Sequence, residues 1–258
     1  MIRNFQKPGR SLVLSNNGMV ASSHSFSSSI GVETLKKGGN AVDAAIAANA
    51  AIGLMEPTGN GIGGDLFAII WIENNKKLYG LNASGRSPKN LKLEYFKNNG
   101  FLKIPAYGPL PVSVPGCVDG WFEMHEKFGS LNMKQILKPA INYAENGFYM
   151  TDYMADVLYK YNEKMSYFPE TKKIFQKDYP NFRNKKLFQK DLAKTLRVIS
   201  LNGRDGFYKG EVAKKITDQM QLNGGLIQSA DLENYNPVWR EPIISSYRDN
   251  KIITMGPP

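Results

Sequence analysis

The sequence contains one cysteine and two histidines among its 258 residues. A single thiol, Cys117, excludes a disulfide scaffold and a cysteine zinc cage. Only His24 and His125 are present, which disfavours a histidine-rich metal site, and we expect neither a metal nor a cofactor. No run approaches the ~20 apolar residues that span a bilayer. The first fifteen residues also lack the apolar stretch of an export signal. These absences predict a cytoplasmic protein that does not associate with membranes.

The charge balance is basic, because 33 Lys and Arg against 23 Asp and Glu give a formal net charge of +10. A composition of 42% apolar and 22% charged residues is ordinary for a globular protein and argues against a disordered chain or a fibre. Residues 160–190, including Tyr179 and Arg183, interleave basic with aromatic side chains, as a base-stacking surface does. Acidic residues in the same stretch favour a solvated face with aromatic anchors, so we expect no nucleic-acid partner.

Residues 1–30 are polar and serine-rich, and the first clear helix is predicted to begin after Asn40. Asn40 is a good N-cap residue, and Asp43 places a carboxylate near the positive end of the helix. The helix is apolar nearly all round, which predicts burial between layers. Residues 66–72 form an apolar run typical of a buried strand, and residues 78–81 can return as its hairpin partner.

Beyond residue 115 the apolar spacing is mostly helical. Five helices are expected, and the last apolar pairs predict two strands around a turn at residues 248–250. The expected helices lie near residues 118–128, 133–146 (with Pro139 inside), 153–161, 192–202 and 212–223. The final strand, residues 252–254, has the composition of a core strand and needs a pairing partner. With no internal repeat and no long linker, we treat residues 1–258 as one unit.

Three motifs have more than one interpretation. Gly59, Gly61 and Gly64 fit the spacing of a dinucleotide motif, but here a helix precedes and a strand follows, which is the wrong order. A tight turn with positive φ that allows close backbone approach fits better. Arg86 lies on the loop after the second strand, where a guanidinium can hold a carboxylate through two hydrogen bonds. Taken alone, an ordinary surface arginine is the more frequent case. Cys117 follows a Pro-Gly turn, but a buried apolar role is favoured over a nucleophile.

The histidines are weak candidates for catalysis. His24 lies among serines, but no nucleophile-elbow motif is present. His125 lies on the apolar stripe of its helix, which favours a core or boundary position.

Several motifs occur in an order that resembles the γ-glutamyltranspeptidase family of N-terminal-nucleophile hydrolases, from about residue 18 to the end. They are Gly38-Gly39-Asn40-Ala41-Val42-Asp43-Ala44-Ala45, Gly61-Ile62-Gly63-Gly64, Pro115-Gly116 with Gly120-Trp121, His125-Glu126-Lys127-Phe128-Gly129, Pro139-Ala140-Ile141, Ala144-Glu145-Asn146-Gly147-Phe148, Gly206-Phe207-Tyr208-Lys209-Gly210, Gly224-Gly225, Asp231-Leu232 with Tyr235, and Pro257-Pro258.

The resemblance implies an α+β fold, the αββα sandwich of these hydrolases, of which residues 1–258 are expected to be an incomplete N-terminal portion. It further implies a precursor that cleaves itself into two chains, with the new N-terminal threonine of the smaller chain as nucleophile. The substrate would be a γ-glutamyl amide such as glutathione, and water or an amine would take the glutamyl group. The missing C-terminal chain of the same precursor is the expected partner.

Two departures limit what carries over. No threonine here stands in the family's Thr-Thr-His context, so the nucleophile is expected beyond residue 258 and this chain alone is expected to be inactive. Well-studied members bind the substrate carboxylate through an arginine four residues before the loop proline, where this sequence has Ser84. Arg86 stands two residues before Pro88, in a form that resembles a signal-less branch, and it becomes our candidate substrate contact.

The motifs do not decide between hydrolysis and transpeptidation, and the acyl group need not be glutamyl. A catalytically inactive half-sandwich scaffold is the alternative, and nucleic-acid binding through residues 160–190 is the third hypothesis.

Overall fold

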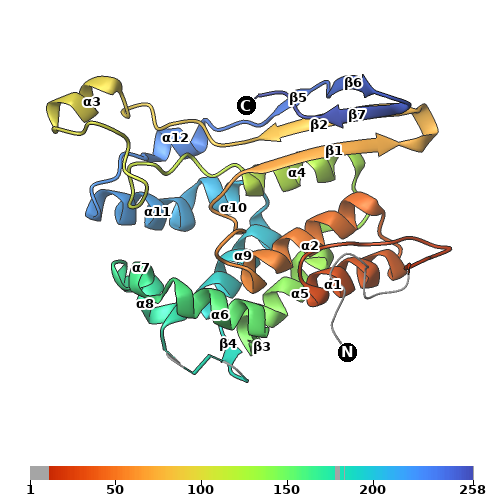
Figure 1. The fold of residues 1–258 in the computed structure, drawn as a ribbon, viewed down its shortest axis with the longest axis horizontal. Coiled ribbons are helices and arrows are strands. Elements are labelled where there is room, and N and C mark those ends of the chain that lie inside the picture. Colours follow the sequence, from red (N-terminus) through yellow and green to blue (C-terminus); the bar gives the residue numbers. More distant parts are fainter. Residues whose placement is uncertain (1–11, 178–180, 183, 258) are drawn as a thin grey trace.

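A computed structural model describes residues 12–177, 181–182 and 184–257 (Figure 1). Outside the described residues lie residues 1–11, part of the segment in which we expect no export signal. Tyr179, Arg183 and Pro258, which are named above, lie outside them as well. The helices are α1 (Ser25–Lys36), α2 (Ala41–Met55), α3 (Leu93–Asn98), α4 (Cys117–Phe128), α5 (Met133–Asn146), α6 (Asp152–Lys160), α7 (Asn162–Ser166), α8 (Pro169–Phe175), α9 (Lys190–Asn202), α10 (Asp205–Tyr208), α11 (Gly210–Leu222) and α12 (Ser229–Glu233). The strands are β1 (Leu66–Ile72), β2 (Lys77–Ala83), β3 (Phe148–Tyr149), β4 (Lys186–Leu187), β5 (Val238–Arg240), β6 (Ile243–Tyr247) and β7 (Asn250–Thr254).

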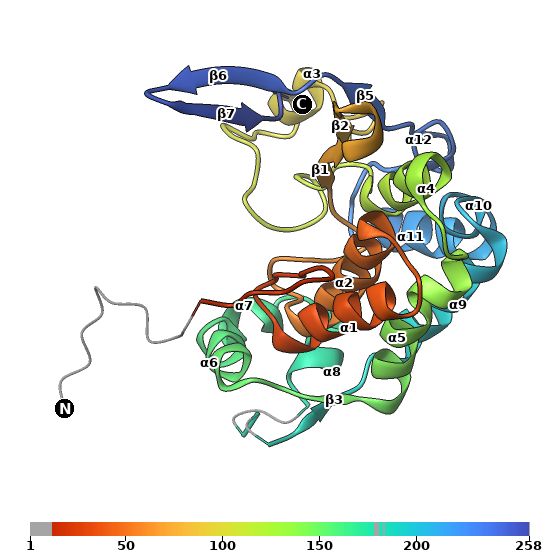
Figure 2. The same cartoon turned by 90° about the vertical axis from the view of Figure 1, so that its right-hand side faces the viewer.

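The main sheet has the order β1-β2-β5, and all its pairs are antiparallel. β1 and β2 form the predicted hairpin, with Leu66 opposite Ala83. β5 joins much later in the chain and places Trp239 opposite Leu81. β6 and β7 form a separate hairpin, which projects away from the helical body in Figure 2.

The predicted buried helix is confirmed. α2 begins with a full capping box. The Asn40 side chain accepts a hydrogen bond from the Asp43 amide, and the Asp43 side chain accepts one from the Asn40 amide. Its small alanines let neighbouring elements approach closely on nearly every side, so Ile46, Ala51 and Leu54 are fully buried. α1, α4 and α5 all pack against it. This helical layer lies on one side of the sheet (Figure 1), with α4 against β1 and β2.

The predicted helices after residue 115 are also confirmed, as α4, α5, α6, α9 and α11. Pro139 lies inside α5 as expected. The expectation that no helix precedes Asn40 is wrong, because α1 occupies residues 25–36. Its buried face carries polar side chains with hydrogen-bond partners inside the fold: the Ser27 hydroxyl donates to the Ala48 carbonyl of α2, and the Thr34 hydroxyl donates to the Ile30 carbonyl of α1 itself. A helix of this kind leaves no apolar period in the sequence.

The expected burial of the strands is wrong on one face. On β1, Phe67, Ile69 and Trp71 are 47, 42 and 50% exposed, while the alternating residues face inward. β6 and β7 are exposed along their whole length. The physical reason is that, within the described part of the chain, the helices cover only one face of the sheet. The run of apolar residues in β1 is typical of a strand that is buried on both faces, and here one of these faces is uncovered.

The glycine loop between α2 and β1 differs from its prediction in conformation. Gly59, Gly61 and Gly64 all lack the positive φ that we expected. Close backbone approach is confirmed, because the Gly64 carbonyl accepts hydrogen bonds from the Gly116 and Cys117 amides at the start of α4. Among the described residues, no helix combines the length and apolarity that crossing a membrane requires.

Candidate functional site

The loop that carries Arg86 follows β2 and is held by its backbone. The Ser84 carbonyl accepts a 3.0 Å hydrogen bond from the Tyr235 hydroxyl. The Gly85 amide donates to the Asp65 carboxylate at 2.7 Å. The Arg86 carbonyl accepts a 2.9 Å bond from the Val114 amide. Three consecutive residues are thus fixed by three different segments, so the direction of the chain at Arg86 is set.

The side chain of Arg86, in contrast, is exposed. Among the described residues its guanidinium has no hydrogen-bond or ion-pair partner. Burial raises the pKa of the nearby Tyr235 hydroxyl, and the charge of Arg86 opposes that rise. A fixed backbone with an unpaired planar cation at its tip can receive a carboxylate through two parallel hydrogen bonds. The structure therefore keeps Arg86 available for the role that the sequence suggested.

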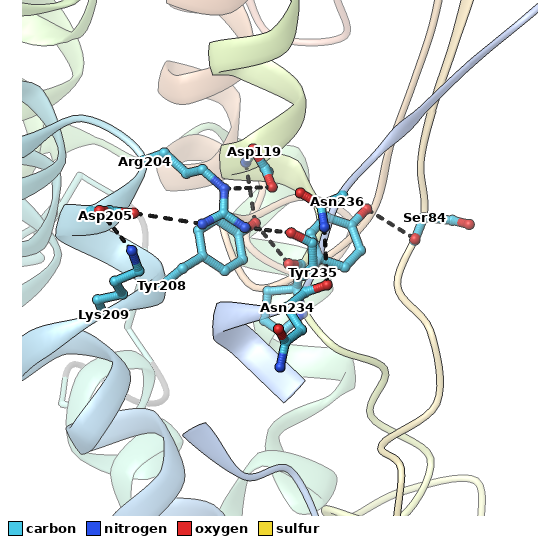
Figure 3. Close-up of polar contacts among 10 residues, drawn as sticks. Ser84, Asp119, Arg204, Asp205, Tyr208, Lys209, Asn234, Tyr235 and Asn236 are labelled. Carbon is cyan, nitrogen blue, oxygen red and sulfur yellow. Dashed lines mark hydrogen bonds and ion pairs between the residues drawn. The ribbon is translucent and has the colours of Figure 1, made fainter. Parts of the chain in front are cut away.

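A polar network lies behind this loop (Figure 3). Arg204 Nε donates to the Asp119 carboxylate at 2.8 Å, and Arg204 Nη2 donates to the Tyr235 carbonyl. The guanidinium also lies over the Tyr208 ring, 4.5 Å from its centroid. The Tyr208 hydroxyl accepts from the Asp119 amide and donates to the Pro115 carbonyl. The network joins α4, α10 and the segment after α12.

Burial dominates the electrostatics of this network. It raises the pKa of Asp119, and the hydrogen bond and charge of Arg204 offset that rise only in part. Burial likewise raises the pKa of both Tyr208 and Tyr235 well above that of an ordinary phenol. Both hydroxyls therefore keep their protons at neutral pH and act as hydrogen-bond donors.

Cys117 is buried at the start of α4, as its favoured interpretation predicted. Burial raises the pKa of its thiol to about 12, and its Sγ lies 3.5 Å from Asn49 Oδ1. A buried thiol with a raised pKa carries little thiolate at neutral pH, which favours the apolar packing role over a nucleophilic one.

The histidines have structural contacts. His24 caps α1, with Nδ1 accepting from the Phe26 amide, and His125 Nε2 contacts the Leu131 carbonyl at 2.5 Å. Over the described ranges no group of three or more His, Cys, Asp or Glu side chains gathers in a way that could hold a metal ion.

Sequence reasoning proposed Arg86 as a substrate contact but gave no indication of the residues that hold its loop. Tyr235 and Gly116 occur in the motifs quoted above, yet their contacts with residues 83 and 84 span from about 30 to about 150 positions of sequence. Asp119 in α4 and Arg204 in the turn between α9 and α10 gave no signal, because single charged residues on helices and turns are normally solvated. The occurrence of Tyr235 in one of the quoted motifs was the only hint in the sequence of its hydrogen bond to the Ser84 carbonyl.

The fold is that of an N-terminal-nucleophile hydrolase, and the described layers correspond to one helical and one sheet layer of its αββα sandwich. The sequence matches the family described as Gamma-glutamyltranspeptidase over residues 27–258. The chain therefore belongs to the gamma-glutamyltranspeptidase family.

Individual relatives agree with this assignment. The glutathione hydrolase proenzyme of Bacillus subtilis (strain 168) is 37% identical over 246 residues, which cover 94% of this chain and 42% of the relative. The Helicobacter pylori gamma-glutamyltranspeptidase structure superposes with a TM-score of 0.89 at 36% identity, covering 96% of this chain and 72% of that one. The cephalosporin acylase structure from Bacillus halodurans gives a TM-score of 0.91 at 36% identity, covering 98% and 49%. The chain thus spans less than half the length of the curated relative.

Proposed function

We propose that this chain is the N-terminal part of an enzyme that cleaves γ-glutamyl amides such as glutathione and passes the glutamyl group to water or to an amine. The observation that carries the proposal is the exposed guanidinium of Arg86, which has no partner among the described residues and lies on a loop whose backbone is fixed. In this role Arg86 binds the α-carboxylate of the glutamyl group. A charge-assisted, two-point contact of this kind both attracts and orients its substrate.

The nucleophile is proposed to lie on polypeptide that corresponds to the remaining length of the relatives. Two observations support this. The chain spans 42% of the Bacillus subtilis glutathione hydrolase proenzyme, and none of its threonines stands in a Thr-Thr-His context. In such an enzyme the threonine hydroxyl attacks the γ-amide carbonyl, the amide C–N bond breaks, and the amine leaves with the hydroxyl proton as the glutamyl ester forms. Water or an acceptor amine then attacks the ester, which releases the glutamyl group and returns a proton to the threonine oxygen.

The uncovered sheet face supports the proposed partner. Phe67, Ile69 and Trp71 form an apolar row along β1, and the β6–β7 hairpin exposes isoleucines on both strands. An apolar area of this kind is normally covered in the working protein. We propose that the C-terminal polypeptide of the same precursor covers it.

A second candidate concerns the acyl group. The Bacillus halodurans cephalosporin acylase is as similar in sequence to this chain as the Helicobacter pylori transpeptidase is, at 36% identity. Arg86 would serve equally well for an acyl chain that ends in a carboxylate, such as a glutaryl group. The same site thus supports acylase activity on glutaryl amides as the alternative.

The test compares two protein samples on two substrates. The full-length precursor and the 258-residue chain are each incubated with glutathione and with a glutaryl amide, and released glutamate or glutarate is measured. The proposal expects glutamate from the precursor and no turnover by the 258-residue chain. Glutarate release alone would establish the acylase alternative. Glutamate release by the 258-residue chain would contradict a nucleophile on other polypeptide.

The non-enzymatic hypotheses have their own tests. A precursor without turnover, together with a monodisperse 258-residue chain that melts cooperatively, would favour an inactive scaffold. Salt-sensitive binding of single-stranded oligonucleotides would favour the surface formed by residues 160–190.

A further inference from the structure

One of the hydrogen bonds that hold the Arg86 loop is donated by a side-chain hydroxyl from a distant segment. Tyr235, just after α12, donates to the Ser84 carbonyl two residues before Arg86 (Figure 3). Asp65 and Val114 hold the next two residues of the loop, but they come from the segments that flank β1 and α4. Tyr235 ties residue 84 to the C-terminal third of the described chain, and the Asp231 carboxylate, which accepts a 3.0 Å hydrogen bond from the Lys89 amide, ties the later part of the loop to it.

Tyr235 is itself held rigidly. Only 2% of it is exposed, and its ring stacks on Tyr208 at 5.9 Å with an interplanar angle of 9°. Its carbonyl accepts from Arg204, which the Asp119 carboxylate holds in turn. Because Asp119 is 4% exposed, this ion pair is shielded from solvent on the carboxylate side. The hydroxyl of Tyr235 is therefore a fixed donor, since both its ring and its backbone are constrained.

The neighbouring backbone is shaped to admit that hydroxyl. A Cβ at Gly116 would collide with the Tyr235 hydroxyl and with the Ala83 carbonyl. Glycine at this position leaves room for the phenol between the end of β2 and the start of α4. The close fit indicates that the contact between Tyr235 and Ser84 belongs to the built structure of the loop rather than to an incidental surface contact.

We infer that Tyr235 is a positioning residue for Arg86: its hydroxyl fixes the Ser84 carbonyl, and so aims the guanidinium at the substrate carboxylate. The inference rests on the proposed function, because it needs a carboxylate-bearing substrate. Tyr235 does not touch the substrate in this account. The Asp119–Arg204 ion pair supports Tyr235 in turn, because Arg204 donates to the Tyr235 carbonyl.

The test is a double-mutant cycle in the full-length precursor, with KM and kcat measured for a γ-glutamyl amide. Tyr235→Phe keeps the ring and its stacking and removes only the hydroxyl. We expect it to raise KM by about three- to tenfold, the factor for one lost hydrogen bond, with kcat changed less than about twofold. In the double variant with Arg86→Ala, the Tyr235→Phe change should add nothing further. Tyr79→Phe, which removes a hydroxyl bonded to Asn75 at the other end of the hairpin, is the matched control and should leave both constants unchanged.

The outcomes separate the two proposals. If Arg86→Ala raises KM but Tyr235→Phe does not, the positioning role is wrong and the proposed function stands. Additive effects of the two substitutions would also overturn the positioning role, since they would show that Tyr235 acts independently of Arg86. If Arg86→Ala leaves KM unchanged, the carboxylate-binding role of Arg86 fails and the positioning role fails with it. A precursor that shows no turnover would instead overturn the proposed function.

Amide hydrogen exchange over residues 84–87 of the same precursor provides a readout that does not depend on activity. Exchange should be faster in Tyr235→Phe than in wild type or in Tyr79→Phe. Equal exchange in all three proteins would overturn the inference.

Discussion

The carboxylate of Asp43 accepts a 2.6 Å hydrogen bond from the hydroxyl of Ser130, which lies 87 residues further along the chain. The same carboxylate accepts from the amides of Ser130 and Leu131, and it caps the Asn40 amide at the start of α2. Asp43 is fully buried. One side chain thus fixes the start of the central helix and joins it to the loop between α4 and α5.

Asp43→Ala is expected to lower the free energy of unfolding by about 2–4 kcal/mol, because several buried N–H and O–H groups would lose their acceptor. Chemical denaturation of the full-length precursor measures this. Asp191→Ala is the matched control, since Asp191 forms only an exposed ion pair with Lys194 and should cost less than about 1 kcal/mol. Equal costs for the two variants would contradict the role assigned to Asp43.

Asp43 also predicts a pH dependence of stability. Burial raises the pKa of its carboxyl, but hydrogen bonds from Ser130, Asn40 and Leu131 together outweigh burial and hold the pKa below its ordinary value. A depressed folded-state pKa gives stability that is fully present above the unfolded pKa of about 3.9 and is lost as the pH falls through the folded value. Below about pH 4, the free energy of unfolding of wild type should therefore fall more steeply than that of Asp43→Asn. Parallel pH profiles would show that Asp43 makes no such contribution.

The sequence predicted those elements whose signals are local. α2 was found from its Asn40 cap and its apolar composition, and α4, α5, α9 and α11 from their apolar period. α1 was missed because Ser27 and Thr34, on its buried face, satisfy their hydroxyls within the fold. The burial of β1 was overestimated, since an apolar strand does not reveal which of its faces is covered. The cytoplasmic location stays a prediction.

At the candidate site, too, the feature with a local signal could be predicted from the sequence and the long-range contact could not. A loop arginine after a strand is visible in the sequence, and the structure keeps its side chain exposed. The brace formed by Tyr235 on Ser84 joins residues 151 positions apart, so no periodicity or local motif could predict it.

Gly116 provides a test of the close packing behind this loop. Its φ of −111° is accessible to any residue, so the constraint is space alone. Since a Cβ there would meet the Ala83 carbonyl and the Tyr235 hydroxyl, Gly116→Ala should destabilise the chain by about 2–4 kcal/mol. At Gly59 no atom lies within 4 Å of an added Cβ, so Gly59→Ala should change stability by less than about 0.5 kcal/mol. The two variants are compared by urea denaturation, and a tolerated Gly116→Ala would refute the packing argument.

Lys127 at the end of α4 predicts a smaller effect. Its ammonium lies 4.2 Å from the Trp239 ring and 4.8 Å from the Tyr79 ring, so it links α4 to β5 and β2. Lys127→Met should lower the free energy of unfolding by about 0.5–1 kcal/mol. Lys127→Arg should lower it less, because it keeps a cation over the two rings. Thermal melting of both variants, with the exposed Lys134→Met as control, gives the comparison. The prediction fails if Lys127→Met and Lys134→Met melt alike.

The central claim is that the guanidinium of Arg86 holds a substrate carboxylate, and the most direct measurement is KM for a γ-glutamyl amide in the full-length precursor carrying Arg86→Ala or Arg86→Lys. Loss of a charge-assisted contact should raise KM by about 10- to 100-fold in Arg86→Ala, with a smaller rise in Arg86→Lys, which keeps the charge but not the two-point geometry. A substrate that lacks the α-carboxylate should show no difference between these proteins. Identical KM values in wild type and both variants would contradict the claim.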